Sequence, residues 1–184
     1  MGQRLRSIAA VILFCAVLPL YARSKKISEI EQTCQDIVAE FPNGPSRIFA
    51  GPDPWFEVDT PPPNALRNGS WAYVYAEGPS IRWLFVREVG PENAWLQDIN
   101  YFYRQDGTLA KRQRSLSAFK SNVSIEAIEY YDANGNLIKD ITHHHPLSGR
   151  HEDTSSFIDH EPPLFPTVAD VPFSDDLELG SRLI

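Results

Sequence analysis

Two dipeptides, Asp106-Gly107 and Asn134-Gly135, constrain the fold of this 184-residue chain more than any other feature. Each lies between runs in which apolar and polar residues alternate, and such dipeptides favour two-residue hairpin turns between paired strands. A further turn is predicted at residues 77–80. Residues 71–142 are therefore expected to form three β-hairpins, which make an antiparallel meander of about six strands.

The last two hairpins match each other at an offset of 28 residues, YRQDGTLAK (103–111) against YDANGNLIK (131–139). One such unit cannot bury its face alone, so neighbouring hairpins are expected to associate. Residues 103–111 and 130–140 resemble the tyrosine-aspartate (YD) repeat of secreted bacterial shell and toxin-delivery proteins, and less closely MORN-type repeats. The resemblance implies hairpin geometry and a structural or binding role.

Ahead of the hairpins, residues 27–41 predict an amphipathic helix. Apolar side chains recur there at helical spacing: Ile27, Ile30, Cys34, Ile37, Val38 and Phe41. Ser28 and Glu31 have the spacing of a capping box. Cys34 lies on the apolar stripe, so we interpret it as a core residue and not as a nucleophile. The linker at residues 42–63 holds seven prolines and predicts an irregular, extended connection.

A helix with one apolar stripe, followed by an antiparallel sheet, predicts an α+β domain in which the helix packs on one face of the sheet. This domain is expected to span residues 23–145. Residues 146–184 are acidic and spaced by prolines. They predict an extended, partly disordered tail whose apolar residues contact the domain or a partner.

Residues 1–22 have the layout of a secretory signal peptide, with Arg4 and Arg6 ahead of an uncharged apolar run from Ile8 to Ala22. That run is shorter than the roughly 20 residues of a membrane-spanning helix. We expect cleavage after about Ala22, with an uncleaved N-terminal anchor as the alternative. The sequence thus predicts a secreted or periplasmic protein with no membrane span after cleavage.

The charge of the chain argues against nucleic-acid partners. The whole chain has a net charge of −7, and removal of Arg4 and Arg6 with the signal peptide makes it more negative. An acidic protein repels phosphate backbones. A local basic cluster is interpreted as a solvated strand face: Arg104, Lys111, Arg112, Arg114 and Lys120.

The histidines all lie between residues 143 and 160. On a strand that reaches His145, the side chains of His143 and His145 point the same way. His151, or a carboxylate of Glu152 or Asp153, could then complete a zinc or copper site. The competing interpretation is a solvated strand end.

Three functions remain open. The first is an exported, non-catalytic domain that binds a protein or small ligand, or serves structurally, through the aromatic face of the sheet. The second is an extracytoplasmic metal-binding protein that uses the His143–His160 segment. The third is a hydrolase whose carboxylates pair only in three dimensions. The chain contains no nucleophile elbow, zinc-protease helix, phosphate-binding loop or paired-cysteine motif, so catalysis is disfavoured.

Overall fold

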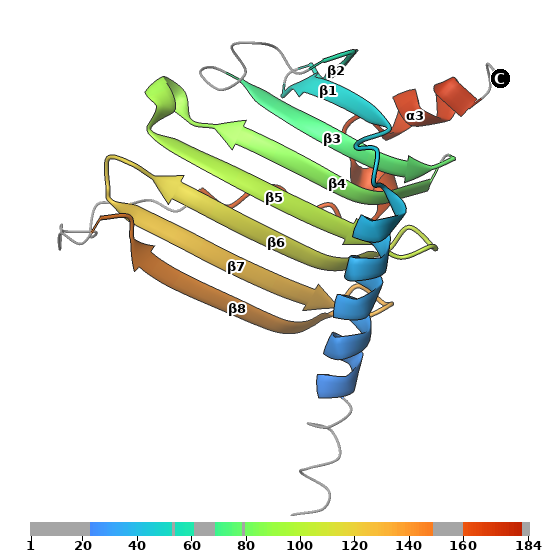
Figure 1. The fold of residues 1–184 in the computed structure, drawn as a ribbon, viewed down its shortest axis with the longest axis horizontal. Helices are drawn as coiled ribbons and strands as arrows, with labels where there is room; N and C mark the ends of the chain where they lie inside the picture. The colour runs from blue at the N-terminus through green and yellow to red at the C-terminus, as the bar shows by residue number, and fades with distance from the viewer. Residues whose placement is uncertain (1–22, 53, 61–68, 79, 149–159, 182–184) are drawn as a thin grey trace, which may run out of the picture.

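The described part of the computed structural model comprises residues 23–52, 54–60, 69–78, 80–148 and 160–181. Its centre is one antiparallel sheet of eight strands in the order β2-β1-β3-β4-β5-β6-β7-β8 (Figure 1). The strands are β1 (Arg47–Gly51), β2 (Phe56–Val58), β3 (Ser70–Glu77), β4 (Ser80–Val89), β5 (Trp95–Tyr103), β6 (Leu109–Ala118), β7 (Val123–Tyr131) and β8 (Leu137–Pro146).

The predicted six-strand meander corresponds to β3–β8, and the predicted strand number is too low. The two additional strands, β1 and β2, come from the proline-rich linker, which was expected to be irregular. Pro45 precedes β1 and Pro52 follows it, so these prolines flank the strand and remove no donor from its ladder. Between them, Phe49 pairs with Ala72 of β3 and is fully buried.

Both glycine dipeptides lie at hairpin turns, as predicted, but the turn geometry differs from the expected two-residue form. Only the glycines are left-handed, each with φ of 79°. The amide of Gly107 donates to the Arg104 carbonyl, and that of Gly135 to the Asp132 carbonyl, both at 3.0 Å. A register shift accompanies each turn, at Tyr103 and at Tyr131. These features describe a three-residue loop with a glycine bulge, and the 28-residue sequence repeat is therefore also a structural repeat.

The N-terminal helix spans residues 23–40 and packs at one end of the sheet, next to the hairpin turns (Figure 1). Ile30, Cys34 and Ile37 are buried in a cluster with Phe102, Ala110 and Tyr130. We call this side of the sheet the helix-side face. The helix crosses the strands and leaves the rest of that face uncovered by any described element. Ser28 lies inside the helix and not at its start, so the predicted capping box is wrong.

The opposite, tail-side face is covered by residues 160–177, which run behind the sheet in Figure 1. Residues 160–181 contain a short 3-10 helix (Val168–Asp170) and α3 (Ser174–Ser181), where the sequence predicted only an extended tail. The ring of Phe173 stacks on Phe49, with 4.1 Å between centroids. Val171 and Leu177 are buried in the same cluster. The predicted contact between tail and domain is thus present in these residues.

No helix in the described part of the chain is long and apolar enough to cross a membrane. The predicted signal peptide, residues 1–22, lies outside the described residues.

Candidate functional site

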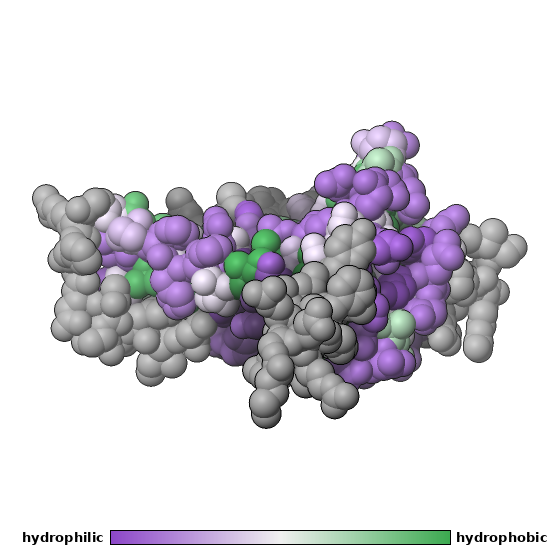
Figure 2. Space-filling view, turned by 90° about the horizontal axis from the view of Figure 1, so that it is seen from below, coloured by the Kyte–Doolittle hydropathy of each residue, from purple (hydrophilic) through white to green (hydrophobic). Residues whose placement is uncertain are grey.

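The uncovered part of the helix-side face carries a mixed aromatic and polar surface. We call it the open surface, and the register of β3–β6 places these side chains on it: Tyr73, Phe85, Arg87, Asp98, Asn100, Gln113 and Ser115. Seen from the β8 side, the helix rises above the sheet at one end, and most of the described surface is hydrophilic (Figure 2). The N-terminal helix therefore borders the open surface on one side.

Aromatic rings of the sheet stack beneath the helix. Tyr75 stacks on Trp83 with 3.9 Å between centroids, and Trp83 lies 5.7 Å from Phe102. Phe41, just after the helix, packs edge-on against Tyr75. The Trp83 indole donates to the Asn100 side-chain oxygen at 2.9 Å. This bond fixes the Asn100 amide at the border between the stack and the open surface.

The open surface itself has a second pair of rings and a fixed ion pair. Tyr73 stacks on Phe85 with 5.6 Å between centroids. Arg87 donates two hydrogen bonds to Asp98, at 2.5 Å each. Hydrogen bonding to Asp98 raises the pKa of the Arg87 guanidinium, although burial opposes it. The guanidinium carbon is also 5.7 Å from the Phe85 ring centroid, so the cation is held beside an aromatic face.

Some hydrogen-bonding groups of this surface remain for a ligand. Arg87 uses Nε and Nη2 for Asp98, and Asn100 uses its oxygen for Trp83. Among the described residues, Arg87 Nη1 and the Asn100 amide nitrogen have no protein partner. Aromatic side chains and preorganised donors therefore lie side by side on the open surface, where they can bind a molecule.

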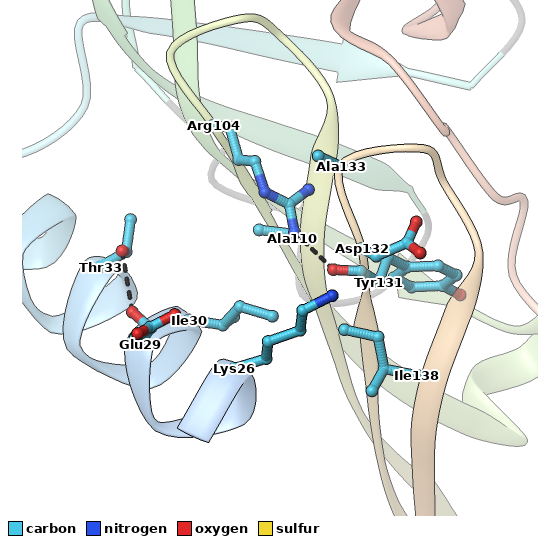
Figure 3. Close-up of a pocket in the computed structure, with 10 residues that line it drawn as sticks. All are labelled: Lys26, Glu29, Ile30, Thr33, Arg104, Ala110, Tyr131, Asp132, Ala133 and Ile138. Carbon is cyan, nitrogen blue, oxygen red and sulfur yellow. Dashed lines mark hydrogen bonds between the residues drawn. The ribbon is translucent and has the colours of Figure 1, made fainter. Parts of the chain in front are cut away.

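A cavity of about 310 Å³ lies where the helix meets the hairpin turns (Figure 3). Lys26 and Glu29 line it from the helix, and Arg104, Tyr131 and Asp132 line it from the turns. Arg104 donates to the carbonyls of Leu109 (2.6 Å) and Tyr131. Burial lowers the pKa of its guanidinium. Arg104 thus joins the two repeated hairpins, and we interpret the cavity as a structural junction.

The sequence interpretation of the basic cluster as a solvated strand face is wrong for its central residues, whereas the Lys120 side chain is exposed. Lys111, Arg112 and Arg114 are all buried. On the helix side, Lys111 donates to the Glu31 carboxylate at 2.8 and 2.9 Å. Tyr130 donates to the same carboxylate at 2.5 Å. Glu31, the expected capping residue, therefore connects the helix to the sheet.

On the tail side, Arg112 lies between two carboxylates. Its guanidinium donates to Glu129 at 2.6 and 2.9 Å and to Glu161 at 2.5 Å. Burial alone would raise the pKa of the Glu129 carboxyl, but hydrogen bonds from Arg112 and Tyr131 outweigh it and hold the pKa below 4.5. Lys111 and Arg112 are neighbours on β6 and point to opposite faces of the sheet, whereas the sequence interpretation placed both on one solvated face. The sequence could not show that distant carboxylates would lie over the cations.

A carboxylate and a histidine also approach each other on the tail-side face. His160 Nε2 is 3.9 Å from Glu88 Oε2, at a cavity of about 380 Å³. The separation exceeds the 2.6–3.2 Å of an acid–base pair, and Glu88 already accepts a 2.5 Å hydrogen bond from Gln97. The His160 ring stacks on Trp95. These contacts favour a packing role over acid–base chemistry.

The structure describes two of the three predicted metal ligands, and they lie on one strand. His143 and His145 are exposed on β8 and point to the helix-side face, with 6.1 Å between their ring centroids. Their common direction was predicted from strand alternation. His151 lies outside the described residues, and His160 is on the tail side. The described residues include no group of three or more histidine, cysteine or acidic side chains placed to hold a metal ion.

Cys34 is buried, as expected from its place on the helix stripe. Burial raises the pKa of its thiol to about 12, so the thiolate is not available at neutral pH.

Comparisons of the chain with protein-family models, curated proteins and solved structures gave no match.

Proposed function

We propose that this protein is an exported, non-catalytic binding domain whose ligand lies on the open surface. The observation that carries this proposal is the position of the helix, which covers one end of the helix-side face and leaves Tyr73 and Phe85 beside the Arg87–Asp98 pair. A sheet whose only task is structural would gain stability by covering these rings. The signal-like residues 1–22 support an extracytoplasmic location.

The chemistry of the open surface favours a carbohydrate as the ligand. Sugar rings have apolar C–H faces that stack on aromatic rings, and their hydroxyl groups accept and donate hydrogen bonds. Tyr73 and Phe85, which are both partly exposed, supply the aromatic surface, while Arg87 and Asn100 supply fixed donors beside them. Gln113, exposed on the neighbouring strand, adds an amide. A shallow, open surface suits a long polysaccharide better than a small molecule, which deep pockets enclose.

Sedimentation with insoluble polysaccharides tests this proposal. The chain from residue 23 is mixed with cellulose, chitin or peptidoglycan, and the bound fraction is measured. We expect binding to at least one of them, and about a tenfold loss of affinity in Tyr73→Ala and in Phe85→Ala, the size of one lost stacking contact. Phe119→Ala is the matched control, because Phe119 is an aromatic residue with 55% exposure away from this surface. No binding to any polysaccharide, or equal binding by all variants, would refute the proposal.

Metal binding at β8 is the second candidate function. The observation that favours it is the pair of exposed imidazoles, His143 and His145, on one side of one strand. Imidazole nitrogen is a preferred ligand of zinc and copper. Calorimetric titration with Zn²⁺ tests it: saturable, submicromolar binding supports a physiological site, whereas millimolar binding indicates the weak affinity of any histidine-rich strand.

A further inference from the structure

The strand that carries the two imidazoles is an edge of the sheet. β8 is the last strand in the order, and the described residues place no strand on its outer side. An edge strand presents unpaired amide and carbonyl groups to any second strand. β8 is ten residues long, which is enough for such pairing.

A hydrogen bond of Leu147, the residue just after β8, shows which backbone groups of β8 point toward β7. The Leu147 amide donates to the Asn122 carbonyl, toward β7, at 3.1 Å. Because direction alternates along a strand, the odd-numbered residues of β8 also bond toward β7 and the even-numbered residues face outward. The Ile138 carbonyl agrees, since it accepts a hydrogen bond from Arg23 on the outer side. Thr142 and His144 therefore present their amides and carbonyls to an incoming strand.

We infer that a divalent zinc-type ion joins two copies of this chain along β8, with His143 and His145 of each copy as its ligands. This inference rests on the second candidate function. An antiparallel pairing with its twofold axis at His144 places His143 of one copy opposite His145 of the other. These two residues then form a pair without mutual backbone hydrogen bonds, where Cα atoms are about 4.5 Å apart. Four imidazoles gather on one face, which is a complete tetrahedral set for zinc.

One copy of the chain supplies too few ligands for a tetrahedral zinc site, so a second copy is needed. It offers two neighbouring imidazoles, and its described residues complete no set of three. Pro146 lacks an amide hydrogen and so weakens strand pairing in the absence of metal. Residues 141–147 carry no lysine, arginine or acidic side chain, so the pairing opposes no fixed like charges. The metal then supplies the free energy that the backbone pairing lacks.

Analytical ultracentrifugation of the chain from residue 23, with and without equimolar ZnCl₂, tests this inference. We expect a monomer that doubles in mass with zinc and returns to the monomer with EDTA. Calorimetry should give one zinc ion for two chains. His143→Ala and His145→Ala should each abolish the mass change. His144→Ala is the matched control: its side chain points to the tail-side face, so this variant should still dimerise.

The outcomes separate the dimer from metal binding itself. One zinc per monomer without a mass change, lost in His143→Ala, would overturn the dimer and leave the second candidate function standing. Absence of zinc binding would overturn both. If His144→Ala loses the zinc-dependent mass change as fully as His143→Ala does, the three consecutive histidines chelate zinc nonspecifically. This result would also overturn the dimer. All three positions are exposed, and circular dichroism confirms that each variant is folded.

Discussion

Both faces of the sheet carry charged and aromatic side chains, but different segments of the chain cover them. On the tail-side face, residues 160–177 lie over Arg112, Glu129 and Tyr101. On the helix-side face, the helix covers one end and leaves the Arg87–Asp98 pair and the Tyr73–Phe85 pair beside solvent. The strands of the two faces are the same. The difference therefore comes from the distant segments that cover them.

Charged side chains also have different roles on the two faces. On the tail side, buried cations are enclosed by carboxylates from β7 and from the tail, so they hold segments together. On the helix side, the one ion pair of the open surface keeps donors that no described residue uses. We expect substitutions on the first face to change stability and substitutions on the second to change binding.

The largest effect is expected for Phe173→Ala, which tests whether the tail segment stabilises the tail-side face. Phe173 is 2% exposed and stacks on Phe49, so its loss leaves a cavity and should lower the free energy of unfolding by about 4 kcal/mol. Urea denaturation measures the change. Leu164→Ala is the control on the same segment, because Leu164 is exposed and should change stability by less than about 0.5 kcal/mol. Equal effects of the two would show that the tail does not close the core.

Breaking the Arg112 pair should have the next largest effect. Arg112→Met leaves the half-buried Glu129 carboxylate without its cation, which should cost about 3 kcal/mol. The double variant Arg112→Met/Glu129→Met removes both charges, and it should recover at least half of that loss. Denaturation curves of the parent chain, Arg112→Met, Glu129→Met and the double variant form a double-mutant cycle. Additive losses would mean that the two side chains do not interact.

The same carboxylates predict a loss of stability in acid. Hydrogen bonds hold the pKa of Glu129 and of Glu31 below 4.5 in the folded chain. The unfolded chain therefore takes up more protons as the pH falls, and the stabilisation present above about pH 5 is lost as the pH passes through the folded-state pKa. Unfolding free energies between pH 7 and pH 3 measure this. Glu129→Gln should flatten the profile, and an unchanged slope would contradict the assignment.

The smallest effects should come from the repeated turns. Gly107→Ala and Gly135→Ala each place a side chain at positive φ, which should cost about 1–2 kcal/mol. A Cβ at residue 107 would meet Val168 of the tail at 3.5 Å, an ordinary contact, while one at residue 135 meets nothing within 4 Å. Thermal unfolding should therefore show a similar loss of stability in the two variants. A much larger loss at Gly107 would mean that the tail is packed more tightly over its turn than these distances indicate.

The sequence predicted the parts of the fold that depend on neighbouring residues. Alternation and glycine turns identified β3–β8, and helical spacing identified the stripe of Ile30, Cys34 and Ile37. It missed β1 because the prolines around Phe49 suggested irregular backbone, although they only flank the strand. It missed α3 because Val171, Phe173 and Leu177 show no helical period: Val171 and Phe173 precede the helix and bind the core individually.

The candidate sites show the same division. The common direction of His143 and His145 follows from strand alternation and was predicted. The open surface was not predicted residue by residue, because it depends on the registers that bring Tyr73 to Phe85 and Arg87 to Asp98. Register between strands and the extent of cover by the helix are tertiary properties. No local pattern in the sequence encodes them.

The position of the tail segment in the chain has a consequence for biosynthesis. Phe173 and Leu177 are translated after every strand of the sheet, yet they complete the cluster around Phe49. A nascent chain that has finished β8 still exposes this apolar surface to solvent or to a chaperone. Contacts between such distant residues also form slowly. The tail-side cluster is therefore completed only after β8 has been synthesised, and its apolar surface stays accessible until the segment through Leu177 has been made.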